Sequence, residues 1–257
     1  MAKVAALVLR APGTNCDLEA VFALESAGAA AHRLHINQVL QQPNVLHAYQ
    51  LLVLPGGFSY GDDVAAGKVL AYRLQHQLSD ALHQFRDAGK LILGICNGFQ
   101  VLLKAGLLVP ADEKQRIPAT LTYNQSGSFI DRWVTLATRQ QNHCPFLTNY
   151  DQMYVPIAHG EGRFICRDQS TLQQLEQNGQ CVLYYSPGRD DDMEPYNPNG
   201  SQGDVAGLCD RTGRILGLMP HPERHVLPVQ HPHWTRLGLK RYGDGLRLFQ
   251  NAVQYLQ

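Results

Sequence analysis

The sequence predicts an α/β fold: a doubly wound, mostly parallel sheet flanked by helices, with a few added antiparallel strands. Three short apolar runs, at residues 4–9, 51–54 and 91–95, have the composition of buried strands, and each is followed by a loop and a helical pattern. Such alternation is typical of a parallel sheet, in which ligands bind beyond the carboxyl ends of the strands. We therefore expect these three loops to share one edge of the sheet.

The first of these elements is a strand over residues 4–9, after which the chain turns at Pro12-Gly13 and helical spacing of apolar residues resumes at Leu18. Asn15 or Asp17 is expected to cap that helix, because both side chains can accept hydrogen bonds from its first N–H groups. The second strand ends in Pro55-Gly56-Gly57 and the third ends at Cys96.

The pattern changes after Pro118, where shorter alternating runs predict antiparallel strands at residues 129–136, 153–157 and 181–185. Residues 186–203 are rich in Pro, Gly, Asn and Asp and are expected to form a long surface loop. A last short strand at 214–219 and a closing amphipathic helix at 243–256 complete one domain that spans residues 1–257.

The composition excludes several classes of function. Lys plus Arg total 22 and Asp plus Glu total 22, so no net charge attracts nucleic acid or an anionic membrane. The six cysteines include no C-x-x-C pair, no signal peptide is expected from the first residues, and the sequence contains no apolar run of about 20 residues. We expect a cytoplasmic protein that has no membrane and no nucleic-acid partner.

Cys96 is the candidate nucleophile. The segment Gly94-Ile95-Cys96-Asn97-Gly98 has the small-x-nucleophile-x-small form of a turn from strand to helix, and a helix N-terminus stabilises a thiolate. The alternative is a small buried hydrophobic side chain, which most free cysteines are. The pentapeptide alone leaves both interpretations open.

His221 and Glu223 are the candidate base and the group that orients it. In an extended chain, residues i and i+2 point to the same side, so the imidazole and the carboxylate can meet. The histidines 221, 225, 231 and 233 could instead suggest a metal site, but prolines interrupt any helix here and no ligand set completes a geometry. We expect no metal.

Acyl transfer also needs N–H donors for the developing oxyanion, and the backbone of Gly57 and of Asn97 can supply them.

Other segments give weaker indications of function. Asp190-Asp191-Asp192 is expected to be a solvated loop, Trp133 and Trp234 are expected to pack, and His159-Gly160-Glu161-Gly162-Arg163 is either a ligand clamp or a turn.

Taken together, Pro55-Gly56-Gly57, the GICNGFQ segment at 94–100 and the MPHPE segment at 219–223 resemble the class I, triad type of glutamine amidotransferase. PGTNCD (12–17), PGGFSYGDD (55–63), AHGEGRF (158–164), NPNGS (197–201) and GLMPHPER (217–224) further resemble one branch, the glutaminase subunits of formylglycinamide ribonucleotide amidotransferases in purine synthesis. The resemblance implies a flavodoxin-like fold.

The resemblance also implies a mechanism and its residues. Cys96 would attack the side-chain amide of L-glutamine, His221 would protonate the departing ammonia and activate water, and Glu223 would orient His221. Gly57 and Asn97 would form the oxyanion hole, and Gln100 is similar to a position that helps to hold glutamine.

The same resemblance implies partners. The chain has no Walker-type loop, and we expect no cofactor in it. ATP, Mg²⁺ and the ribonucleotide would belong to a large synthetase subunit, joined through a small bridging subunit. The acidic loop at 187–195 and the tail after His225 depart from the expected pattern. Two other functions stay open: an amidotransferase with another acceptor, and a catalytically silent binding domain.

Overall fold

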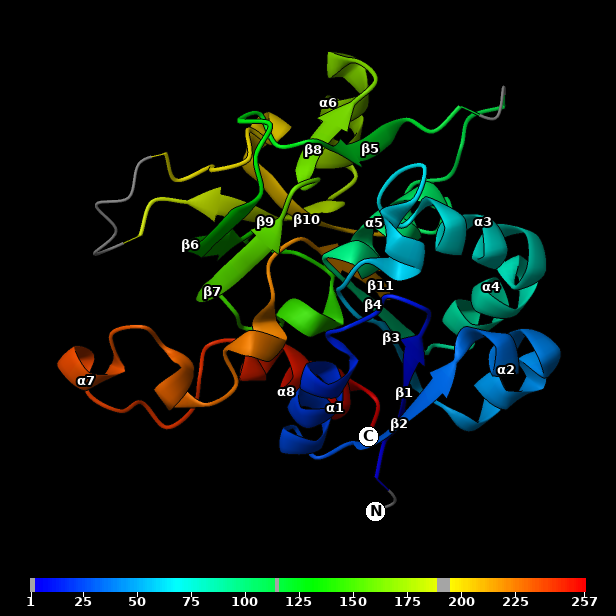
Figure 1. The fold of residues 1–257 in the computed structure, drawn as a ribbon, viewed down its shortest axis with the longest axis horizontal. Coiled ribbons are helices and arrows are strands. Elements are labelled where there is room, and N and C mark those ends of the chain that lie inside the picture. The colour runs from blue at the N-terminus through cyan, green and yellow to red at the C-terminus, as the bar shows by residue number, and fades with distance from the viewer. Residues whose placement is uncertain (1–2, 114–115, 189–194) are drawn as a thin grey trace.

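The computed structural model describes residues 3–113, 116–188 and 195–257, which form a mixed sheet, a small second sheet and surrounding helices (Figure 1). The strands are β1 (Ala5–Arg10), β2 (Ala30–His35), β3 (Leu51–Leu54), β4 (Leu91–Ile95), β5 (Ala119–Thr122), β6 (Ile130–Thr138), β7 (Gln152–His159), β8 (Arg163–Cys166), β9 (Cys181–Ser186), β10 (Val205–Cys209) and β11 (Ile215–Leu218).

The main sheet has the strand order β2-β1-β3-β4-β11-β10-β9-β6-β7. The strands from β2 to β11 pair in parallel, which confirms the predicted parallel sheet. The strands from β11 to β7 pair antiparallel, so the antiparallel part is larger than the few added strands that we expected. Strands β5 and β8 form a separate antiparallel pair.

The helices fall into groups that pack beside the sheet. Helix α1 contacts β1, β2 and α8, while α3 contacts α4 and α5, and α5 packs on β4 and β11 (Figure 1). The bounds of the helices are α1 (Asp17–Ser26), α2 (Ile36–Gln41), α3 (Lys68–Gln77), α4 (Ser79–Asp87), α5 (Asn97–Lys104), α6 (Gln169–Gln177), α7 (Trp234–Leu237) and α8 (Leu246–Tyr255). In the described ranges, no helix has the length and apolar character that crossing a membrane requires.

The parallel strands form because they are continuous apolar runs rather than alternating ones. Every residue of β3 (LLVL), β4 (LILGI) and β11 (ILGL) is buried, as expected for central strands that are covered on both faces. Each such run is too short for a helix of typical length, and a turn or loop follows it directly. The core therefore holds β4 and β11 side by side.

The loops after β1 and β3 meet at the carboxyl edge of the sheet, as predicted. Thr14 and Gly57 form an isolated antiparallel bridge, and the Cys16 N–H donates to the Gly56 carbonyl over 3.3 Å. Strand β11 pairs with β4 so that Leu218 lies beside Ile95. The residues after β11 are consequently delivered to the same edge, next to Cys96.

One local expectation is wrong and one is incomplete. Helix α1 has Cys16 at its N-cap and no side chain there makes a capping hydrogen bond, because Asp17 lies in the first turn and instead pairs with Arg33 at 2.8 Å. The segment 186–203 is not simply a surface loop, since Asn199 and Ser201 are buried. The acidic triplet Asp190-Asp191-Asp192 lies outside the described residues, as does most of the segment 187–195.

Candidate active site

Cys96 lies at the sharp turn between β4 and α5. Its backbone dihedrals are φ 51° and ψ −107°, a conformation that non-glycine residues rarely adopt and that marks a strained position. Its N–H donates to the Leu218 carbonyl at 2.8 Å, and its side chain is 5% exposed. The turn holds the thiol at the edge of the sheet, which confirms the expected strand-to-helix elbow.

Gly98 shows why the turn needs glycine. A Cβ atom at this position would lie 1.9 Å from the Leu54 carbonyl oxygen, a backbone atom that no side-chain rotation can move away. The start of α5 therefore packs directly against the end of β3. This close approach fixes the first turn of the helix, and with it the position of Cys96.

His221 and Glu223 follow β11 and form a buried pair. The His221 Nδ1 and the Glu223 Oε1 lie 2.6 Å apart, both residues are 1% exposed, and the backbone N–H of His221 donates to the Pro156 carbonyl at 2.8 Å. Burial lowers the pKa of His221, but the charges of Glu223 and Cys96 outweigh that effect and raise its pKa well above the usual value. The pairing with Glu223 therefore favours the protonated form of His221.

Cys96 and His221 come together beside Gly56. A Cβ atom on Gly56 would lie 2.8 Å from the His221 Cε1 atom and 3.4 Å from the Cys96 Cβ atom. Glycine leaves the space through which the imidazole approaches the thiol side chain. The three predicted catalytic residues, Cys96, His221 and Glu223, are therefore neighbours in the structure.

A cavity of about 190 Å³ opens beside Cys96. It is smaller than the roughly 300–1,000 Å³ of sites that hold drug-sized ligands, so it suits a small molecule. Its lining comes from the loops after β3 and β7, from the start of α5 and from the chain around β5 and β6: Gly57, Phe58, Asp62, Ala66, Cys96, Gln100, Tyr123, Phe129, Ala158, His159, Gly160 and Glu161.

Both predicted oxyanion donors lie near the thiol. Gly57 lines the cavity and has φ 132°, and a Cβ atom there would lie 2.7 Å from the Asn15 N atom, so only glycine fits. Asn97 is the first residue of α5, where N–H groups have no partner within the helix. Its buried side chain donates to Asp62 at 2.9 Å and accepts from the Ser59 N–H, which braces the loop after β3.

Gln100 lines the same cavity, but its side chain already holds two neighbours. Its Nε2 donates to the Glu161 carbonyl, and its Oε1 accepts from the Asn97 side chain at 3.1 Å. Gln100 therefore fastens the loop after β7 to α5. The Glu161 carboxylate in turn accepts from the Ala66 N–H at 3.3 Å.

The sequence left the role of residues 159–163 undecided, and in the structure residues 159–161 form one wall of the cavity. His159 is buried, and its Nδ1 lies 3.0 Å from the Asn124 Oδ1. Burial, followed by the charge of His221, lowers the pKa of His159 to about 3. His159 is therefore neutral at physiological pH and does not replace His221 as the proton carrier.

Asn199 supports this wall from behind, a role that sequence reasoning missed. Its Nδ2 donates to the Gly162 carbonyl at 2.8 Å and to the Tyr185 hydroxyl at 3.1 Å, and its Oδ1 accepts from the Ser201 N–H at 3.0 Å. The signal was available in the Asn-Pro-Asn-Gly-Ser composition, since such side chains bond to the backbone as readily as they face water.

Truncation of Asn199 should therefore destabilise the protein. We expect Asn199→Ala to lower the free energy of unfolding by about 2–3 kcal/mol, because it leaves buried groups without partners. Urea denaturation would measure this loss. The exposed Asn178 provides a control, as Asn178→Ala should cost less than about 0.5 kcal/mol. Equal losses in the two variants would contradict the supporting role of Asn199.

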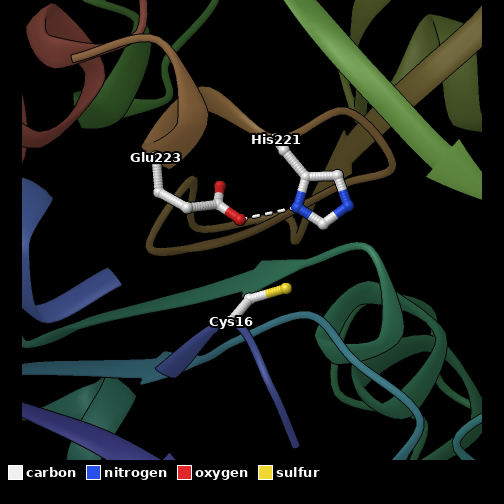
Figure 2. Close-up of side chains that lie close together, drawn as sticks. All are labelled: Cys16, His221 and Glu223. Atoms are coloured by element: carbon white, nitrogen blue, oxygen red, sulfur yellow. Dashed lines mark hydrogen bonds and ion pairs between the residues drawn. The ribbon is translucent and has the colours of Figure 1, made fainter. Parts of the chain in front are cut away.

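Cys16 is the other residue that sequence reasoning missed. Its Sγ, a His221 ring nitrogen and a Glu223 carboxylate oxygen all lie within 4.8 Å of one another, and Figure 2 shows the thiol beneath the paired imidazole and carboxylate. Burial raises the pKa of the Cys16 thiol, although His221 opposes the shift. Cys16 does not line the cavity beside Cys96, so it is poorly placed to act as the nucleophile.

The histidines that we considered together do not surround one point with His221. His225 and His231 pack instead with Trp133, whose ring centroid lies 5.1 Å from that of His225. This confirms a packing role for Trp133. A larger cavity of about 470 Å³ lies beside His231, between β7 and the tail, and contains none of the predicted site residues.

The chain matches known proteins over nearly its whole length. Residues 3–256 match the model of the CobB/CobQ-like glutamine amidotransferase domain. A phosphoribosylformylglycinamidine synthase subunit PurQ from Dehalococcoides mccartyi is 45% identical over 99% of this chain and 98% of the relative. The PurQ subunit from Methanococcus maripaludis is 42% identical over 97% of this chain and 96% of the relative.

Among solved structures, PurLQS from Thermotoga maritima matches with 33% identity and a TM-score of 0.75, over 100% of both chains. A strained cysteine at a strand-to-helix turn, a buried His-Glu pair beside it and a small cavity all fall within the matched residues. The chain belongs to the family of CobB/CobQ-like glutamine amidotransferase domains.

Proposed function

We propose that the chain is the glutaminase subunit of a phosphoribosylformylglycinamidine synthase, which hydrolyses L-glutamine and delivers the ammonia to a synthetase subunit. The observation that carries the proposal is the meeting of Cys96, on its strained turn, with the buried His221–Glu223 pair at a small cavity. A nucleophile, a proton carrier and a group that orients the carrier are the parts that acyl transfer requires.

In the first half of the reaction, the Cys96 thiolate attacks the side-chain amide carbon of glutamine. The C–S bond forms, and the carbonyl oxygen takes the electron pair of the C=O π bond. His221 then gives a proton to the amide nitrogen, the C–N bond breaks and ammonia leaves. A thioester between Cys96 and the glutamyl group remains, and the raised pKa of His221 suits its role as the proton donor.

In the second half, water replaces the sulfur. His221, now neutral, takes a proton from the water as it attacks the thioester carbon, and the C–S bond breaks to release glutamate. Glu223 stabilises the imidazolium in each half and keeps the ring oriented through its contact with Nδ1. The N–H groups of Gly57 and Asn97 are proposed to stabilise the oxyanion in both steps.

The cavity also suits the amino-acid part of glutamine. Asp62 and Glu161 line it, and their carboxylates complement the α-ammonium group of the substrate. Gln100 is proposed to hold the substrate site in shape. Its side-chain amide donates to the backbone carbonyl of Glu161 and so ties that residue to α5. Ammonium recognition by carboxylates would distinguish glutamine from a simple amide.

Removing one of these charges should weaken substrate binding. We expect Glu161→Gln to raise KM for glutamine by about 10-fold or more, since a hydrogen bond to a charged group contributes about 1.5–3 kcal/mol. Steady-state glutaminase kinetics would measure the change. Asp63→Asn is the matched control, because Asp63 is an exposed acid in the same region and does not line the cavity. A KM that stays unchanged in Glu161→Gln would contradict ammonium recognition there.

The partner subunits are part of the proposal. The curated relatives are named as subunits of a synthase, and the solved relative is PurLQS. We propose that a large synthetase subunit holds ATP, Mg²⁺ and formylglycinamide ribonucleotide, and that a small bridging subunit joins it to this chain. We further infer a reducing, cytoplasmic location, since all six cysteines are unpaired.

Reconstitution tests this function. We expect purified synthetase and bridging subunits to form formylglycinamidine ribonucleotide from glutamine only when this chain is added. A mixture that uses ammonia as before but gains no glutamine-dependent activity from the chain would contradict the proposed acceptor or partner. Glutaminase activity that appears only with a different synthetase would assign the chain to another acceptor.

A further inference from the structure

The proposed mechanism leaves one reactive group beside the triad without a role, the thiol of Cys16. This thiol, a ring nitrogen of His221 and a carboxylate oxygen of Glu223 lie within 4.8 Å of one another, and all three side chains are buried (Figure 2). They come from two segments far apart in the chain, the loop before α1 and the loop after β11. Cys16 is therefore brought to the pair by the fold.

We propose that Cys16, His221 and Glu223 form a binding site for a thiophilic divalent metal ion such as Zn²⁺, and that the bound ion stops glutamine hydrolysis. One sulfur, one imidazole nitrogen and one carboxylate oxygen are the donor types that Zn²⁺ accepts, and a fourth position remains for water. Mg²⁺ and Ca²⁺ are disfavoured because they require oxygen donors.

Two atoms of the His221–Glu223 pair have bonding capacity left in this structure. Among the described residues, the buried atoms His221 Nε2 and Glu223 Oε2 have no hydrogen-bond partner. Such orphaned polar atoms are uncommon in folded proteins and call for a ligand or a functional role. Binding of the ion displaces the thiol proton of Cys16 and the ring proton of His221 to solvent, and the resulting thiolate and the carboxylate balance the charge of the ion.

The backbone holds the three ligands in place. The Cys16 N–H donates to the Gly56 carbonyl, and the His221 N–H donates to the Pro156 carbonyl, so both chain segments are tied to the sheet edge. Only the side chains need to move to bring the donor atoms to bonding distance from an ion, which is about 2.0–2.3 Å for zinc. The donor atoms already lie within 4.8 Å of one another, and an ion would replace the 2.6 Å contact between His221 and Glu223.

One cation occupies part of this space. The Arg224 Nη2 donates to the Cys16 Sγ at 3.2 Å and would repel a divalent ion. Arg224 also pairs with Glu19 at 3.3 Å, and its side chain is 31% exposed. The guanidinium can therefore turn toward Glu19 and solvent when an ion arrives, which leaves the thiolate to the metal.

The consequence for the enzyme follows from the shared residues and rests on the proposed function. An ion that engages His221 and Glu223 takes the proton carrier and its orienting carboxylate out of the reaction. Cys96 is not one of the three ligands, so the ion would act on proton transfer and leave the nucleophile uncoordinated. Ammonia-dependent synthesis by the partner subunit would continue.

Cobalt absorption tests the site directly and needs no enzyme activity. Co²⁺ added to the full chain should produce a thiolate charge-transfer band in the wild type and in Cys96→Ala, and no such band in Cys16→Ser. Cys166→Ser is the matched control, because Cys166 is buried in β8, outside the site, and should keep the band. A band that survives in Cys16→Ser but disappears in Cys96→Ala would overturn the proposal, as would no band in the wild type.

A second measurement does not depend on the folding of the Cys16 variant. X-ray absorption at the zinc edge, on Cys96→Ala protein loaded with one equivalent of Zn²⁺, should count one sulfur ligand with nitrogen and oxygen neighbours. A zinc shell without sulfur would overturn the site.

Inhibition tests the consequence. For each protein, the rate of glutamine hydrolysis is expressed as a fraction of its own rate without metal. The Zn²⁺ concentration that halves this rate should be at least about 10-fold higher for Cys16→Ser than for the wild type. An equal half-inhibitory Zn²⁺ concentration in the wild type and in Cys16→Ser would refute inhibition through Cys16. A chain that binds Co²⁺ through Cys16 but shows no glutaminase activity would instead refute the proposed function, so the two failures can be told apart.

Discussion

Replacing Cys96 with alanine is expected to reduce glutamine-dependent synthesis by at least about 10⁴-fold, because the thioester cannot form without the sulfur. The same complex should keep its activity with free ammonia, since that reaction bypasses the glutaminase site. Both rates can be measured in the reconstituted complex, with glutamine or an ammonium salt as the nitrogen source. The informative result is a loss of the glutamine-dependent rate while the ammonia-dependent rate is kept.

Cys166→Ser should leave both rates of this assay unchanged, because Cys166 lies in β8 and does not line the cavity. The thermal stability of the Cys96→Ala protein should stay close to that of the wild type or exceed it. The substitution only shortens a side chain that lines the cavity, in a strained turn. An equal loss of the glutamine and ammonia reactions would indicate that Cys96 serves assembly, not chemistry.

Gly98→Ala is expected to have the largest effect on stability, lowering the free energy of unfolding by about 3 kcal/mol or more. The added methyl group would lie 1.9 Å from the Leu54 carbonyl oxygen, so β3 and α5 must separate. Denaturant unfolding measures the loss. Because Cys96 lies at the start of α5, glutaminase activity should fall as well.

Gly160→Ala is the control for this prediction. The nearest atom to a Cβ at Gly160 is 3.9 Å away, in the Phe129 side chain, so the substitution should change stability by less than about 0.5 kcal/mol. If the two alanine variants unfold at the same denaturant concentration, the close packing of α5 on β3 does not determine the stability of the turn.

The sequence predicted the part of the molecule that depends on local patterns. Buried runs such as residues 51–54 and 91–95 end in loops, and parallel pairing places those loops at one edge without any knowledge of side-chain contacts. The pairing of His221 with Glu223 was also predicted, although Pro222–Arg224 form a 3-10 turn instead of the extended chain that the prediction assumed. These inferences succeeded because each depends on neighbours in sequence or on strand order.

The remaining features depend on contacts between distant segments. Cys16 reaches His221 only because the loop after β1 pairs with the loop after β3, a bridge that leaves no mark in the composition of either loop. Asn199 is buried because Gly162 and Tyr185 need its hydrogen bonds, whereas its local sequence is typical of an exposed turn. The expected cap of α1 failed because Arg33, on the neighbouring strand, recruits Asp17.

The identity of the nucleophile is the central claim, and two cysteines approach His221. Cys96 lies on the strained turn at the cavity, whereas Cys16 lies outside the cavity lining and burial raises the pKa of its thiol. The most direct measurement is to treat the chain with a diazoketone analogue of glutamine and to locate the adduct by peptide mass spectrometry. We predict one adduct, on Cys96, that excess glutamine prevents. An adduct on Cys16, or none while glutamine hydrolysis continues, would contradict this account.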